Sequence, residues 1–84
     1  MTLTIKVLGP GCANCENLEK NAREAVDALA VEATIEKVTD RAEFARYGLL
    51  YTPGLVIDEK LVAGGRIPAV TEISTWLADA AAAN

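Results

Sequence analysis

The amino-acid sequence predicts an α/β fold in which the elements follow one another as β-α-β-α-β-β-α. In the first half of the chain, a short apolar run is followed by a long amphipathic stretch and then by a run of alternating apolar and polar residues. In the second half, two apolar runs flank a turn and are followed by a last amphipathic stretch. A strand-helix-strand unit predicts parallel strands joined by a right-handed crossover, and a hairpin predicts antiparallel neighbours. We therefore expect one four-stranded mixed sheet, ordered second–first–third–fourth, with helices on both faces.

The first half of the chain supplies two strands and a long helix. Residues 3–8 form an apolar run that stops at Gly9-Pro10-Gly11, as a strand followed by a turn would. Residues 13–29 favour a helix, and residues 31–38 alternate apolar and polar side chains as an edge strand does. The apolar stripe expected on the helix consists of Cys15, Leu18, Ala22, Ala25 or Val26, and Leu29.

A short helix comes next. Asp40 is a capping residue with Glu43 three positions on, and Gly48 is a typical helix stop. Phe44 and Tyr47 are the residues that this helix is expected to turn inward.

The last third predicts a hairpin and a final helix. Residues 54–57 and 61–63 are apolar runs that flank Asp58-Glu59-Lys60, and Gly64-Gly65 ends the second run. Pro68 suits the first turn of a helix because its missing N–H needs no partner there. The inward residues expected on this helix are Val70, Ile73, Trp76 or Leu77, and Ala80.

Length and charge restrict the function. Eighty-four residues are enough for one domain, residues 1–84, and leave no room for a second core. The net charge is −4 with no basic patch, which argues against nucleic acid as a partner. The N-terminus does not look like a signal peptide, and no apolar stretch is long enough to span a membrane. We therefore expect a cytoplasmic protein that does not bind membranes.

Cys12 and Cys15 carry the strongest chemical signal, because they lie where a strand gives way to a helix. Two intervening residues wound as a first helical turn bring the side chains to one face, with the alpha carbons within the roughly 7 Å that a disulfide needs. So short a loop would stabilise the fold by only about 2 kcal/mol in the chain-entropy model. In a reducing cytoplasm such a pair indicates redox chemistry or metal binding rather than a structural disulfide.

The two cysteines are expected to have different roles. The N–H groups and partial positive charge at the start of a helix favour a thiolate, and Cys12 stands there. Cys12 is therefore the predicted nucleophile, and Cys15, on the buried stripe, is the predicted resolving thiol. The chain has no histidine to act as a base, and Glu16 beside the pair opposes thiolate formation.

At these residues the chain resembles the thioredoxin superfamily, and most closely its small, glutaredoxin-sized redox-active disulfide proteins of archaea and bacteria. The resemblance lies in three segments at matching order, Gly11-Cys12-Ala13-Asn14-Cys15, Tyr51-Thr52-Pro53 and Gly64-Gly65. It implies a thioredoxin-like fold and a thiol–disulfide oxidoreductase. It also implies that Pro53 is cis and packs against the active disulfide, and that the backbone of Thr52 binds substrate.

The resemblance extends to partners, and it has gaps. It implies protein disulfide substrates and a thiol reductase as partners, with no cofactor, and we expect a monomer. Ordinary thioredoxins carry a tryptophan where this chain has Gly11, and a buried acid in the region where it has Lys6. The proton acceptor of the resolving thiol is therefore not assigned by the resemblance.

A soft-metal chaperone is the alternative. Gly11-Cys12-Ala13-Asn14-Cys15 also resembles the Gly-x-x-Cys-x-x-Cys loop of small soft-metal chaperone domains, in which two thiolates hold Cu(I) or Zn(II). Chaperone domains of that kind run β-α-β-β-α-β and end on a strand, whereas this chain is expected to end on a helix. A closed structural zinc site would lack two ligands. We therefore expect no resident metal.

Overall fold

The computed structural model describes residues 2–11 and 13–83, and its elements follow the predicted order. The second strand begins at residue 33, two positions later than predicted, and the other strands begin within one residue of their predicted starts. The strands are β1 (Leu3–Leu8), β2 (Ala33–Val38), β3 (Gly54–Ile57) and β4 (Lys60–Gly64), and the helices are α1 (Ala13–Leu29), α2 (Arg41–Arg46) and α3 (Val70–Ala83).

The four strands form one sheet in the order β2-β1-β3-β4, which confirms the predicted topology. β1 and β2 are parallel, with Leu3 opposite Ala33 and Leu8 opposite Val38. β3 is antiparallel to both β1 and β4, and a bulge falls in the β3–β4 pairing. The carboxyl end of β1 therefore meets the amino end of β3 at one edge of the sheet.

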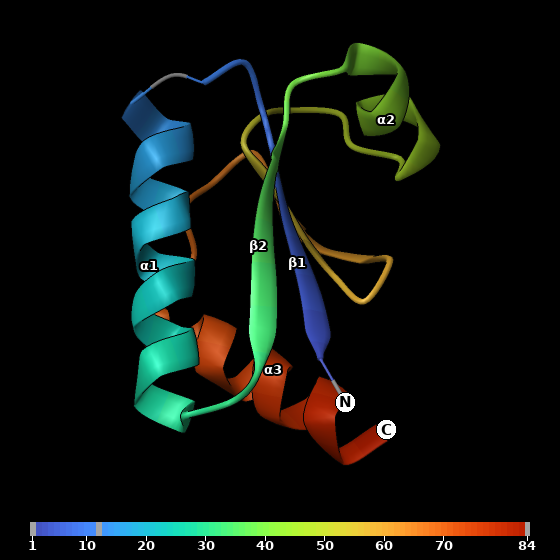
Figure 1. The fold of residues 1–84 in the computed structure, drawn as a ribbon. Helices are drawn as coiled ribbons and strands as arrows, with labels where there is room; N and C mark the ends of the chain where they lie inside the picture. The colour runs from blue at the N-terminus through green and yellow to red at the C-terminus, as the bar shows by residue number, and fades with distance from the viewer. Residues whose placement is uncertain (1, 12, 84) are drawn as a thin grey trace.

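Helices cover both faces of this sheet (Figure 1). α1 and α3 pack on each other and on one face, whereas α2 lies over the other face, near the carboxyl end of β1. Alternate residues of β1 point into the layer between the sheet and α1 and α3. The core in this layer consists of Leu3, Ile5, Val7, Cys15, Leu18, Ala22, Ala25, Leu55, Ile57, Ala63, Ile73 and Leu77.

α2 begins and ends at the predicted residues. The Asp40 side chain accepts a hydrogen bond from Ala42 N at 2.9 Å, as an N-cap does. At the other end Gly48 has φ +77°, and Leu49 N donates to Phe44 O at 2.9 Å. This is a Schellman ending, in which a glycine adopts the left-handed conformation that other residues disfavour.

The side chain of Leu49 packs on two glycines of the sheet. Gly54 and Gly64 lie opposite each other in β3 and β4, and Gly54 also lies opposite Leu8 in β1. A Cβ on either glycine would lie 2.7 Å from Leu49 Cδ1. The absence of side chains at Gly54 and Gly64 therefore makes room for Leu49, in the segment that connects α2 to β3.

The chain differs from the sequence-based expectations at three places. α3 begins at Val70, so Pro68 precedes the helix, and the Glu72 carboxylate accepts from Ala69 N at the helix start. Leu29, the last residue of α1, is exposed although it lies on the predicted stripe. Phe44 and Tyr47 are only half-buried, and α2 has no fully buried residue.

None of the helices in residues 2–11 and 13–83 is both long and apolar enough to span a lipid bilayer.

Candidate active site

The site lies where β1 ends, α1 begins and the chain enters β3. Cys15, in the first turn of α1, is buried among the apolar residues of the core, as its place on the predicted stripe required. Its sulfur packs against Gly9, just beyond β1, so closely that a methyl group at Gly9 would overlap it. The same methyl carbon would lie 3.9 Å from Pro53 Cα. The end of β1, the start of α1 and the distant Pro53 therefore meet near the sulfur of Cys15.

Pro53 and Thr52 form the other wall of the site. The Thr52–Pro53 peptide bond is cis, as the resemblance implied, and Pro53 is buried. The carbonyl oxygen of Pro53 accepts from Gly65 N at 2.9 Å, so this segment is tied to the end of β4. Thr52 is exposed, and within the described residues its backbone N–H and C=O have no hydrogen-bond partner.

Cys12, the predicted nucleophile, lies outside the described residues, and so does its predicted contact with Pro53. In the sequence it directly precedes α1 and follows Gly11, whose φ is +89°. Residues 2–11 and 13–83 contain no group of three or more histidine, cysteine or acidic residues that could hold a metal ion.

A small hollow of about 50 Å³ lies beside Cys15. Besides Cys15, the ionisable residues described in its wall are Glu16 and Lys37. Lys37 Nζ lies 3.1 Å from a carboxylate oxygen of Glu19. The hollow is large enough for one water molecule. The apolar Val7 and Gly9 form part of the remaining wall, so within the described residues no buried carboxylate approaches Cys15 from β1.

Lys6 has a role that the sequence did not predict. Its Nζ donates to Tyr47 Oη at 2.8 Å and lies 3.2 Å from Glu59 Oε1. The Tyr47 hydroxyl also contacts the Glu59 carboxylate and accepts from Arg46 at 2.7 Å. The hydrogen bond with Tyr47, and to a smaller extent the one with Glu59, raises the pKa of Lys6. The hydrogen bond with Tyr47, and to a smaller extent the one with Lys6, lowers the pKa of Glu59.

These four residues connect β1, α2 and the β3–β4 turn across the face opposite the core. They come from places 41 and 53 residues apart in the chain, so no local pattern could have revealed them. Because Lys6 points away from Cys15, it does not replace the buried acid of ordinary thioredoxins.

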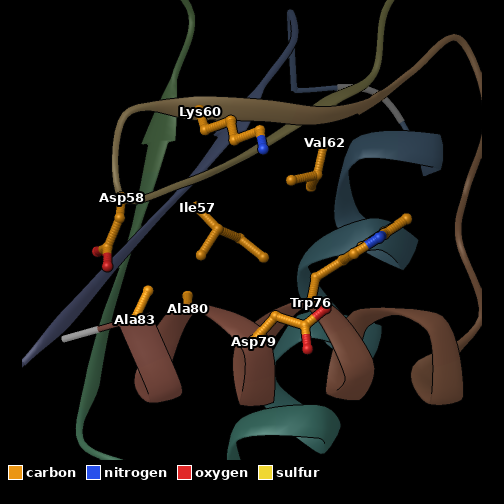
Figure 2. Close-up of a pocket in the computed structure, with 8 residues that line it drawn as sticks. All are labelled: Ile57, Asp58, Lys60, Val62, Trp76, Asp79, Ala80 and Ala83. Carbon is orange, nitrogen blue, oxygen red and sulfur yellow. The ribbon is translucent and has the colours of Figure 1, made fainter.

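A second hollow, of about 330 Å³, lies between the β3–β4 hairpin and α3. Figure 2 shows Ile57 and Val62 facing Trp76 and Ala80 across it. Ile57 is at the end of β3 far from Pro53, so this hollow is separate from the Cys15 site. Of the two inward residues that the sequence left open, Leu77 lies in the core and Trp76 is partly buried against it.

Comparisons with known proteins point to one family. A family model described as "Thioredoxin domain" matches residues 3–78. A thioredoxin of Methanothermobacter thermautotrophicus is 43% identical over 75 residues, which cover 89% of this chain and 97% of that protein. A thioredoxin of Methanocaldococcus jannaschii is 39% identical over 75 residues, or 89% of this chain and 86% of that protein.

The fold comparison agrees. The crystal structure of the germline-specific thioredoxin Deadhead of Drosophila melanogaster superposes with a TM-score of 0.66. The match covers 93% of this chain and 80% of that chain at 14% sequence identity, so it speaks for the fold alone.

Proposed function

Because this chain belongs to the thioredoxin family and is a thiol–disulfide oxidoreductase of that kind, we propose that Cys12 and Cys15 form its reactive pair. Cys12 is the nucleophile and Cys15 is the resolving thiol. The observation that carries this proposal is the position of the Cys15 sulfur, which is buried in the first turn of α1 against Gly9 and near Pro53. A cysteine three residues before Cys15 in the sequence is within reach of it for disulfide formation.

The reaction transfers two electrons to the substrate. The Cys12 thiolate attacks one sulfur of the substrate disulfide, forms a bond to it and releases the other sulfur as a thiolate. Cys15 loses its proton to that released thiolate and attacks the sulfur of Cys12. The Cys12–Cys15 disulfide closes and the second substrate sulfur leaves as a thiolate, which takes a proton from water to complete the dithiol. A thiol reductase then returns two electrons to the pair.

Thr52 and Pro53 bind the substrate in this proposal. Thr52 supports it because its exposed backbone N–H and C=O lack partners within the described part of the chain. An extended peptide gains affinity by pairing with such groups as an added strand. Protein disulfides are therefore the proposed substrates. A single domain of residues 1–84 that works as a monomer in the cytoplasm belongs to the same proposal.

Similarity to thioredoxins does not favour the soft-metal chaperone. The order of elements also differs from the β-α-β-β-α-β order of those chaperone domains, because α2 lies between β2 and β3.

Reduction of a protein disulfide such as that of insulin, with an excess of a small dithiol as electron source, tests the proposal. The wild-type protein is expected to accelerate the reduction, and Cys12→Ser and Cys15→Ser are each expected to abolish the acceleration because turnover needs both thiols. Two observations would contradict the assignment: full turnover by either variant, or no turnover by a wild-type protein that binds Cu(I) tightly and loses it equally in both variants.

A further inference from the structure

Two large apolar side chains beside the site are exposed to solvent. Leu50 is 86% exposed and Tyr51 is 75% exposed, and the other exposed large apolar residue within the described residues is Leu29, at 36%. The Cβ of Tyr51 lies close to Gly65, where an added Cβ would be 3.1 Å from it. Adjacent apolar side chains held out in water, next to a reactive site, indicate a surface that a partner covers.

These side chains border a groove. A shallow hollow of about 510 Å³ lies between Pro10, the α2 region and residues 49–52. Its walls are mainly apolar, with Phe44 and Leu49 beside Leu50 and Tyr51, and it ends at Thr52. A peptide paired with the backbone of Thr52 would therefore place a neighbouring side chain in this groove.

Arg41 gives the groove a positive charge, and among the described residues of the wall it is the only ionisable one apart from Tyr51. The other arginines of the chain all have a carboxylate partner, since Arg23 pairs with Glu19, Arg46 with Glu43 and Arg66 with Glu72.

Within the described residues the guanidinium of Arg41 pairs with no carboxylate. The nearest acid in sequence, Asp40, is engaged in capping α2. Arg41 also stands in the first turn of α2, where the helix dipole disfavours a cation, so helix stability does not explain its charge.

We infer that this groove selects protein substrates in which a large apolar residue and an acidic residue flank the reacting cysteine. This inference rests on the proposed exchange at Cys12 and Cys15 and adds its substrate class. The apolar residue covers Leu50 and Tyr51, and the acidic residue pairs with Arg41. A basic residue in the same place is repelled by Arg41, which adds discrimination against such partners.

Short peptides with one cysteine, joined by a disulfide to the same small neutral thiol, test the inference. The set pairs leucine or serine on one side of the cysteine with glutamate, glutamine or lysine on the other, in both orders. The second-order rate constant for reaction with the reduced protein is measured by acid quench and chromatography. Each value is divided by the rate constant for bis(2-hydroxyethyl) disulfide, so that changes in thiolate reactivity cancel.

We expect leucine to be preferred over serine by about tenfold, from partial burial of its side chain. Glutamate is expected to be preferred over glutamine by about threefold, the size typical of an exposed ion pair. The glutamate preference disappears in about 1 M salt, where charges are screened within about 3 Å, and the leucine preference remains.

Variants assign these preferences to residues. Arg41→Glu reverses the order of the glutamate and lysine peptides, whereas Leu50→Ser reduces the leucine preference. Arg23→Gln, which removes an exposed arginine of α1, is the matched control and keeps both preferences. Equal rates across the peptide set, or a glutamate preference that survives Arg41→Glu, would overturn the inference while the exchange itself stands. If neither the peptides nor the small disulfide react, the proposed function fails and the inference falls with it.

Discussion

Gly9 follows β1 directly, and the sulfur of Cys15 occupies the space that a side chain at this position would take. The backbone of Gly9 is held by a hydrogen bond from its N–H to Val38 O at 2.9 Å. The sulfur of Cys15 therefore packs on a fixed stretch of backbone rather than on a side chain that could move aside. This contact sets the position from which Cys15 attacks in the proposed mechanism.

Gly9→Ala is expected to lower the free energy of unfolding by about 1–3 kcal/mol, as overpacking of a filled site does. It also displaces the sulfur of Cys15, so the mixed disulfide between Cys12 and substrate persists longer than in the wild type. Urea denaturation and the lifetime of the mixed disulfide on non-reducing gels measure the two effects.

Gly11→Ala is the matched control for this substitution. Among the described residues a Cβ at Gly11 meets no atom within 4 Å, but the φ of +89° strains any side chain there. The strain lowers stability by about 1 kcal/mol without moving the sulfur of Cys15. An equally long-lived mixed disulfide in both variants would show that contact with the sulfur is not the cause.

Among the elements, the β3–β4 turn has an unusual backbone. Asp58 and Glu59 have φ of 48° and 69°, the signature of a tight hairpin turn that favours asparagine and glycine. The turn is held by Asp58 N donating to Thr4 O at 2.8 Å, and by Thr4 N donating to the Asp58 side chain at 2.9 Å. This conformation directs the Glu59 carboxylate onto Lys6 and Tyr47.

Glu59→Gln is expected to make stability less dependent on pH. Because the folded state lowers the pKa of Glu59, the unfolded chain takes up the proton first as the pH falls. The stabilisation is complete above the ordinary glutamate value of about 4.3 and is lost as the pH falls through the lower folded value.

Urea denaturation of wild type and variant at mildly acidic and strongly acidic pH measures this effect. The difference in stability between them should shrink toward low pH. The pKa of Glu72 is lowered too, by Arg66 and then Ala69, but this group is common to both proteins. A difference that stays constant with pH would rule out the contribution of Glu59.

The contact between Leu49 and the two glycines predicts non-additive substitutions. Gly54→Ala in the wild type places a Cβ 2.7 Å from Leu49 Cδ1 and is expected to cost about 1 kcal/mol. In a Leu49→Ala background the same substitution meets no leucine and is expected to be neutral or stabilising. The double-mutant cycle, measured by urea denaturation, should give a coupling of about 1 kcal/mol. Additive effects would mean that Leu49 moves aside at no cost.

For the molecule as a whole, the sequence predicted what depends on local pattern. Hydrophobic periodicity predicted the strands and helices, and the handedness of crossovers predicted the sheet order that the structure has. The burial of Cys15 followed from its place on the stripe of α1. The nucleophilic role of Cys12 stays a prediction, since this residue lies outside those described.

The sequence could not predict what depends on contacts between distant segments. The link from Lys6 to Tyr47 and Glu59 joins places 41 and 53 residues apart, and no local pattern reports such a pair. Leu29 fits the helical stripe, but it is the last residue of α1 and is exposed, which the stripe alone does not reveal. Pro68 is suited to the first turn of a helix, yet α3 begins only at Val70, where the Glu72 carboxylate accepts a hydrogen bond from Ala69 N.

The central claim is the division of labour between Cys12 and Cys15, and the trapping of mixed disulfides tests it most directly. Cys15→Ser leaves the attacking thiol in place but removes the resolving one, so covalent complexes with disulfide proteins should accumulate. Cys12→Ser removes the attacking thiol and should give none. Both variants are incubated with an oxidised protein substrate, quenched by alkylation and analysed on non-reducing gels. Complexes with Cys15→Ser alone are the predicted result; complexes with Cys12→Ser alone, or with neither variant, would contradict the account.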